Sequence, residues 1–132
     1  VNPTIDIPPE CKPTGKNYLD MCLIQRSGDM LTASGAGGIN EVQYAALLMM
    51  IAKNCGYEPG VFTHFVANEQ IYDRHVDAAN EMLKRGGTGS IRRDIALKLN
   101  TDKTNFYDFT VDDFEMVNYE PQKPQLKLEL GI

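Results

Sequence analysis

Hydrophobic positions along the chain fall into blocks of different length and spacing. Tyr18–Gln25 is a nearly continuous apolar run of strand length, which predicts an interior strand. Over residues 40–55, apolar side chains recur at helical spacing and also fill the other sides, so we expect a long helix that is buried all round. Asn40 and Gln43 have the spacing of a capping box, which makes Asn40 a candidate N-cap, and Gly56 supplies the stop.

The rest of the chain alternates between short strand-like blocks and turn-forming residues. An amphipathic pattern that ends in basic residues predicts a second helix at 76–85. Thr110 and Asp113 have the spacing of a short capped turn. Extended segments are expected at residues 4–7, 61–67, 95–99, 114–119 and 126–130, and loops at 8–17, 30–38 and 86–90.

This order of elements predicts an α/β (α+β) domain in which a mixed β-sheet packs on the long helix at 40–55. With 132 residues, the chain is expected to form a single domain with its own core. It opens without Met and has four of its seven prolines in the first sixteen residues, so we interpret it as part of a longer protein.

Composition and charge narrow the class of partner. A net charge of −5 and a pI near 4.9 argue against a nucleic-acid polymer, which is bound through clustered Lys and Arg. No apolar run is long enough to span a membrane and no signal peptide is evident, so we expect a cytoplasmic protein.

Cysteines and histidines give no metal pattern. Cys11, Cys22 and Cys55 match no zinc spacing and are expected to be reduced thiols, with Cys22 packed as a small apolar residue in its strand. His64 and His75 have no second ligand at helical spacing and are expected to be structural, so no metal site is predicted.

A polar run, Gln25-Arg26-Ser27-Gly28-Asp29, follows the first strand and is the candidate binding edge. Arg26 offers a fork of donors suited to phosphate or carboxylate, and Ser27 adds a hydroxyl. Gly28 allows close approach of the backbone, and Asp29 can accept two hydrogen bonds from a heterocycle. The alternative is a solvated turn with a surface ion pair.

Four ordered motifs together resemble the C-terminal half of the thymidylate synthase family, from about Tyr18 to Ile132. They are Gln25-Arg26-Ser27-Gly28-Asp29, Ile39-Asn40-x-x-x-Tyr44-x-x-Leu47, Gln70-Ile71-Tyr72-x-x-His75 and Asp112-Asp113-Phe114-x-x-x-x-Tyr119-x-Pro121. The resemblance implies a partial thymidylate synthase-like fold, with residues 1–17 as a loop and strand remnant of a missing N-terminal half.

The resemblance also implies roles for single residues. Arg26 and Ser27 would hold the 5′-phosphate of deoxyuridine monophosphate (dUMP), with Gly28 beside them. Asn40 would pair with the pyrimidine at N3 and O4, because an amide offers the acceptor and the donor that uracil needs there. The remaining implied contacts are Gln70 and Tyr72 at the ribose 3′-hydroxyl, and Asp29 and Gly131 at the folate.

The activity that this resemblance implies is the reductive methylation of dUMP to dTMP by a dimeric methyltransferase of dTMP biosynthesis, with 5,10-methylenetetrahydrofolate as co-substrate. A cysteine thiolate attacks C6 of the pyrimidine in this family. Cys11 lies fifteen residues before Arg26, about five too few for the family pattern, which at about 3.3 Å per extended residue misplaces its sulfur by more than about 15 Å. We therefore expect the nucleophile upstream of Val1, with Cys11 as the weaker candidate, and an inactive fragment.

Departures from the family pattern leave two alternatives open. Gln70 stands where the family usually has His, and the loop between Asp29 and Asn40 is longer than expected. One alternative is a non-catalytic nucleotide-binding or dimerisation module of the same fold. The other is a pyrimidine nucleotide hydroxymethylase, for which Asn40 would have to favour cytosine rather than uracil.

Overall fold

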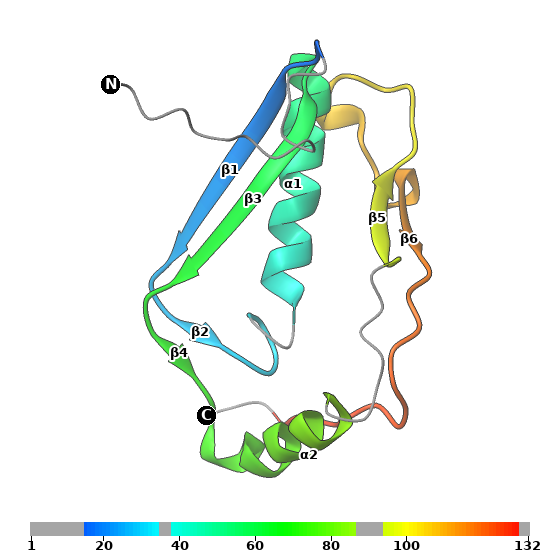
Figure 1. Cartoon of the computed structure of the whole chain (residues 1–132). Helices are drawn as coiled ribbons and strands as arrows, with labels where there is room; N and C mark the ends of the chain where they lie inside the picture. Colours follow the sequence, from blue (N-terminus) through cyan, green and yellow to red (C-terminus); the bar gives the residue numbers. More distant parts are fainter. Residues whose placement is uncertain (1–14, 35–37, 87–93, 130–132) are drawn as a thin grey trace, which may run out of the picture.

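The computed structural model describes residues 15–34, 38–86 and 94–129. Within these ranges the chain combines helices with three separate two-stranded sheets (Figure 1). The predicted α+β class is confirmed. The expected mixed sheet is instead divided, because the parallel and antiparallel pairs belong to different sheets.

The largest sheet pairs β1 (Tyr18–Gln25) with β3 (Glu58–Val66) in parallel, from Tyr18 opposite Glu58 to Gln25 opposite Val66. The predicted bounds of β1 are confirmed, whereas β3 begins three residues before the predicted residue 61. Burial alternates along both strands, so only one face of the pair is covered. The expectation of an interior strand is therefore wrong for the described residues, and Cys22 is exposed on the uncovered face.

The covered face of the β1–β3 pair packs against α1 (Ile39–Cys55), which runs along it in Figure 1. Gly38 and Gly56 flank the helix in the left-handed conformation, with φ of 66° and 73°, which glycine adopts without a Cβ penalty. The helix begins at Ile39, so Asn40 lies inside it and the predicted Asn40–Gln43 capping box is wrong.

The core within the described residues is small. Leu48 and Ala52 are the buried residues of α1, whereas Ile39 is 62% exposed and Val42 46% exposed. The prediction of a helix buried all round is therefore not met here, since the described elements cover only part of its circumference.

Beyond the ends of β1 and β3, the chain makes a second, much shorter parallel pair. β2 (Gly28–Asp29) lies beside β4 (Glu69–Gln70), and Figure 1 shows both as continuations past the longer strands. Sequence reasoning assigned these residues to a polar run and a connection, because two-residue strands carry no periodic pattern.

The second half of the chain contains a 3₁₀ helix (Asp73–His75), α2 (Val76–Gly86) and the antiparallel pair of β5 (Ala96–Leu99) and β6 (Phe114–Val117). Two more 3₁₀ helices, Phe106–Asp108 and Val111–Asp113, precede β6. The predicted capped turn is confirmed, because the Asp113 carboxylate accepts hydrogen bonds from the N–H (2.7 Å) and hydroxyl (3.1 Å) of Thr110.

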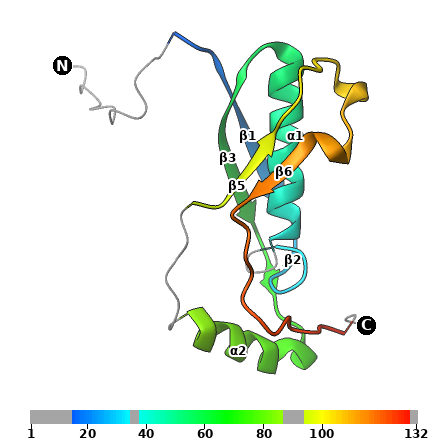
Figure 2. The same cartoon turned by 90° about the vertical axis from the view of Figure 1, so that its right-hand side faces the viewer.

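The last described residues run alongside α2 (Figure 2). Leu126 and Leu128 are half-buried and Lys127 and Glu129 are exposed, as the alternation predicts, but residues 126–129 form no strand. The predicted strand is therefore wrong. The backbone carbonyl of Glu129 bonds the ring of His75, a side chain, and not the backbone of a neighbouring strand. The predicted strand at 4–7, Cys11 and Gly131 lie outside the described residues.

Candidate functional site

Pairing of β2 with β4 brings the polar run after β1 beside residues that follow β3. Gly28 lies opposite Glu69 and Asp29 opposite Gln70. Backbone bonds lock this register, from Gly28 N–H to the Asn68 carbonyl (3.0 Å) and from Met30 N–H to the Gln70 carbonyl (2.9 Å). Candidate residues that are about forty positions apart in sequence thus share one end of the molecule.

The bend after β1 exposes the candidate anion-binding residues. Arg26 and Ser27 are both exposed, and the Arg26 guanidinium has no hydrogen-bond or ion-pair partner among the described residues. The Ser27 carbonyl accepts a hydrogen bond from Gln25 Nε2 at 2.8 Å. This arrangement leaves a rigid cationic fork open to an anionic ligand.

Gly28 is buried, and its lack of a side chain serves internal packing. A Cβ at this position would overlap Ser34 Oγ and lie 3.0 Å from Glu69 Oε2. Ser34 is itself fully buried and donates to Glu69 Oε1 at 2.6 Å. Gly28 thus packs against the protein's own Ser34–Glu69 pair, which the sequence did not reveal, and its place beside a bound ligand stays a prediction.

The Asp29 carboxylate organises the turn that follows it. One oxygen accepts from Leu31 N–H at 3.2 Å and the other from the Thr32 hydroxyl, while the Asp29 carbonyl accepts from Ala33 N–H at 3.0 Å. An aspartate that bonds the backbone two residues ahead is a common turn-former. The segment after Asp29, predicted to be a loop, is thus an ordered turn as far as Ser34, and both carboxylate oxygens of Asp29 already have partners.

Asn40 sits in the first turn of α1, where its side chain meets the end of β1. Asn40 Nδ2 lies 3.2 Å from Gln25 Oε1, and His64 Nε2 of β3 lies 3.0 Å from the same oxygen. The other ring nitrogen of His64 lies 2.9 Å from Glu41 Oε1. We call Gln25, Asn40, Glu41 and His64 the amide cluster.

Sequence reasoning included Gln25 in the candidate binding edge without a contact of its own, and it gave Glu41 and His64 no role in binding. A signal was nevertheless present in the alternation of the strand. His64 shares the covered face of β3 with Phe62 and Val66, and an apolar residue is the norm at such a position. Its side chain is 10% exposed. A buried polar group needs a partner, and here the partners are on two other elements.

Tyr72 and His75 lie at the start of the segment before α2. Tyr72 is 41% exposed, and its ring meets that of His75 edge-on with centroids 5.6 Å apart. His75 is 1% exposed and its Nε2 lies 2.7 Å from the Glu129 carbonyl. The end of the described chain is therefore tied to the element that carries Tyr72.

The structure thus brings Arg26, Ser27, Gly28, Asp29 and Gln70 together around β2–β4, with Asn40 joined to them through Gln25. Among the described residues, no hydrogen bond or ring contact links Tyr72 directly to this group, although it follows Gln70 by two residues. With this arrangement in view, comparison with known proteins is decisive: the family model described as thymidylate synthase matches residues 7–132.

The chain belongs to the thymidylate synthase family. It is 50% identical over 119 residues to the thymidylate synthase of Lactococcus lactis subsp. cremoris (strain SK11), an alignment that covers 89% of this chain and 40% of the relative. It is 48% identical, with the same coverage, to that of Streptococcus pneumoniae (strain ATCC 700669 / Spain 23F-1). The chain therefore spans about 40% of the length of these family members.

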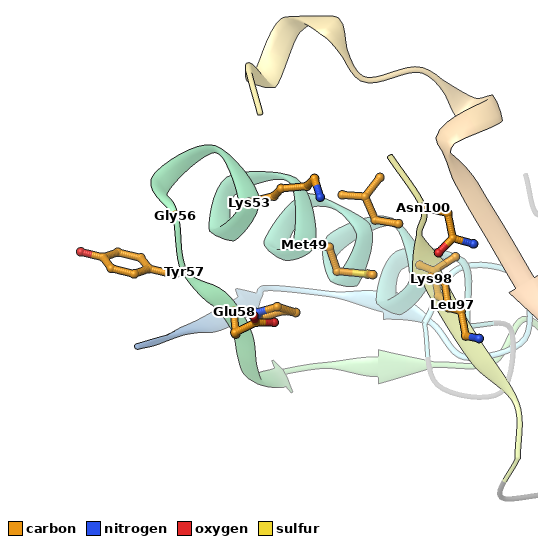
Figure 3. Close-up of a pocket in the computed structure, with 10 residues that line it drawn as sticks. Met49, Lys53, Gly56, Tyr57, Glu58, Leu97, Lys98 and Asn100 are labelled. Carbon is orange, nitrogen blue, oxygen red and sulfur yellow. The ribbon is translucent and has the colours of Figure 1, made fainter. Parts of the chain in front are cut away.

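A cavity of about 480 Å³ lies near the C-terminal end of α1 (Figure 3), beside β5. Its lining includes Met49, Lys53, Glu58, Leu97 and Asn100, and none of the predicted site residues. This cavity and the candidate residue Asn40 thus lie at opposite ends of α1.

The described residues carry neither a metal-binding cluster nor a membrane-spanning helix. No group of three or more His, Cys, Asp or Glu side chains in residues 15–34, 38–86 and 94–129 could hold a metal ion. Over the same ranges, no helix is both long and apolar enough to cross a membrane.

Proposed function

We propose that this chain is the nucleotide-binding part of a thymidylate synthase, which methylates dUMP to dTMP with 5,10-methylenetetrahydrofolate as co-substrate. Family membership supports the reaction class. The observation that supports dUMP as the substrate is the orientation of the Asn40 amide, whose Nδ2 lies 3.2 Å from Gln25 Oε1.

Asn40 in this orientation matches uracil. With one Nδ2 hydrogen given to Gln25, the amide keeps its Oδ1 acceptor and its second N–H for a ligand. Uracil offers a donor at N3 and an acceptor at O4, whereas cytosine offers the reverse pair. This favours dUMP over the cytidine nucleotide that a hydroxymethylase of this fold would take.

The rest of the nucleotide fits the exposed residues around β2–β4. Arg26 and Ser27 would bind the 5′-phosphate, since the guanidinium is exposed and has no protein partner among the described residues. Gln70 and Tyr72 would bind the ribose 3′-hydroxyl, with Gln70 contributing an amide that cannot titrate. Asp29 and Gly131 would face the folate.

Neither described thiol suits the role of nucleophile. Cys22 points to the face of β1 opposite the one from which Gln25 reaches Asn40. Cys55 lies fifteen residues after Asn40 on α1, about 22 Å away at about 1.5 Å per residue. We therefore propose a nucleophile upstream of Val1, keep Cys11 as the weaker candidate, and expect no turnover by the 132 residues alone.

We also propose that the protein works as a homodimer in the cytoplasm. The uncovered face of the β1–β3 pair exposes large apolar side chains, with Ile24 75%, Val61 64% and Phe65 59% exposed. An apolar sheet face of this kind favours burial against a second copy of the chain. Cys22 and Cys55 are free thiols, which fits a reducing compartment.

Calorimetry with dUMP tests the proposal, using this chain joined to the upstream part of a family member. We expect saturable binding that Arg26→Ala weakens by about tenfold to a hundredfold, the loss typical of hydrogen bonds between charged groups. Lys98→Ala is the matched control, because it removes an exposed cation from β5. Absence of dUMP binding by the joined protein would leave only the scaffold alternative.

A turnover assay separates the remaining outcomes. If the 132 residues alone convert dUMP, and Cys11→Ser abolishes that conversion, the upstream nucleophile is wrong and Cys11 takes its place. Stronger binding of dCMP than of dUMP would instead reject the uracil assignment of Asn40.

A further inference from the structure

The amide cluster contains two residues, Glu41 and His64, that no step of the proposed reaction uses. Glu41 follows Asn40 in the first turn of α1, and His64 lies on the covered face of β3. Figures 1 and 2 show α1 packed along β3. His64 Nδ1 lies 2.9 Å from Glu41 Oε1, and His64 Nε2 lies 3.0 Å from Gln25 Oε1. Both lie beside Asn40, the residue proposed to bind the pyrimidine, with side chains that are 10% (His64) and 31% (Glu41) exposed.

The orientation of the Gln25 amide follows from its neighbours. A backbone carbonyl can only accept, so the Gln25 end that lies 2.8 Å from the Ser27 carbonyl must be the NH₂ group. The other end is then Oε1, which can only accept. Both groups that approach it, Asn40 and His64 Nε2, must donate.

This requirement fixes a hydrogen on His64 Nε2. A bare Nε2 would place a lone pair 3.0 Å from the Gln25 oxygen, which is repulsive. On the other side of the ring, one hydrogen lies between Nδ1 and Glu41 Oε1, because a bare carboxylate facing a bare nitrogen would also repel. Glu41 therefore supplies the partner that lets His64 keep its donor on Gln25.

The Gln25 oxygen also fixes the orientation of the Asn40 amide. Turned over, its amide would place Oδ1 against Gln25 Oε1 and would present to the pyrimidine the donor and acceptor order that cytosine accepts. The orientation of Gln25 thus decides the orientation of Asn40. Removing His64 takes away one of the two donors that hold Gln25 Oε1 in place.

We propose that Glu41 and His64 are positioning residues that hold Gln25, and through it Asn40, in the orientation that selects uracil over cytosine. The assignment rests on the proposed function for its substrate. Its structural part, a hydrogen-bond relay from Glu41 to Asn40, can be tested without any nucleotide.

The first test measures the dissociation constants of dUMP and dCMP for the complete protein and its variants. His64→Leu replaces the imidazole by an apolar side chain of similar length and so removes the donor to Gln25. We expect the preference for dUMP to fall by about tenfold, the value of one hydrogen bond. Glu41→Leu should act in the same direction. Glu41→Gln should retain most of the preference, because its NH₂ can donate to Nδ1 and leave Nε2 as the donor.

Two controls separate positioning from general damage. Glu58→Leu removes a carboxylate whose Lys16 partner lies on the surface, 2.9 Å away, and should leave the preference unchanged. Binding of 2-deoxyribose 5-phosphate, which has no base, should be the same in all variants. An unchanged dUMP preference in His64→Leu, with the base-free ligand still bound, would overturn the proposal.

The second test records nitrogen-15 NMR spectra of the side chains without nucleotide. We expect a hydrogen on His64 Nε2 and a shift of the Asn40 side-chain amide in both leucine variants. An Asn40 amide signal that does not move in His64→Leu would overturn the relay. If the wild-type protein binds neither nucleotide, the proposed function fails, and this spectrum still decides the relay.

Discussion

His64 Nε2 lies 3.0 Å from Gln25 Oε1, so a histidine of β3 donates to the last residue of β1. The contact links two strands through their side chains, in addition to the parallel ladder between their backbones. It also places a buried histidine one amide away from Asn40. Asn40, the proposed pyrimidine-binding residue on α1, is thereby linked through side chains to two strands that come from either side of it in the sequence.

Gly28→Ala is expected to destabilise the protein. The new methyl group would overlap Ser34 Oγ inside the β2–β4 junction, and overpacking of this kind costs about 1–3 kcal/mol. Gly86→Ala is the control, because a Cβ there meets no atom within 4 Å. Urea unfolding monitored by circular dichroism measures both. Equal stability of the two variants would show that the junction can accommodate a side chain.

Asp113→Asn is expected to lower the stability of the protein at neutral pH. It should also make that stability depend less on pH in the acid range. The Lys103 ammonium at 2.8 Å and the Thr110 N–H hold the pKa of the Asp113 carboxyl well below its usual range. A carboxyl whose pKa is lowered on folding stabilises above its unfolded pKa of about 3.9, and this contribution is lost as pH falls through the folded value. The melting temperatures of wild type and Asp113→Asn should therefore converge as the pH is lowered from neutral to acid.

The matched control for that series is Asp102→Asn, which makes the same chemical change at an exposed position nearby. It should shift the melting temperature less at neutral pH than Asp113→Asn. If the gap between wild type and Asp113→Asn stays constant with falling pH, the stabilisation comes from the shape of the turn rather than from the charge of Asp113.

His75→Ala is expected to loosen the end of the chain. His75 is among the largest fully buried side chains, and its ring nitrogen bonds the Glu129 carbonyl at 2.7 Å. Truncation leaves a cavity and a lost hydrogen bond, with an expected cost of about 2–4 kcal/mol. Limited proteolysis should then cut the segment before Glu129 faster, and His75→Gln, which keeps a donor, should be cut more slowly than His75→Ala.

Phe65→Glu tests the proposed homodimer. Phe65 is 59% exposed on the uncovered face of β3, and a carboxylate there would be desolvated in any interface formed on that face. We expect sedimentation velocity of the complete protein to show a shift toward monomer. Leu83→Glu is the control, since Leu83 is 74% exposed on α2. A dimer unaffected by Phe65→Glu would exclude this face as the interface.

Local periodicity predicted the long regular elements well. The bounds of β1 agree with the expected run, α1 begins one residue before the expected start, and α2 ends one residue after the expected end. Such elements repeat one pattern over several turns or several alternations, so neighbouring residues reinforce each other. The family, too, was identified from motifs that are each a few residues long, and the match over residues 7–132 confirms it.

Local sequence patterns were therefore enough to predict the long helices and strands, the family and the residues that make up its motifs. Tertiary structure alone decided how those motifs are held: Asn40 lies within α1 rather than at its cap, and its partner Gln25 is fifteen residues away in sequence. His64 meets the same amide from thirty-nine residues away. Hydrogen bonds over such separations depend on how strands and helix pack, and no local pattern of polar and apolar residues encodes them.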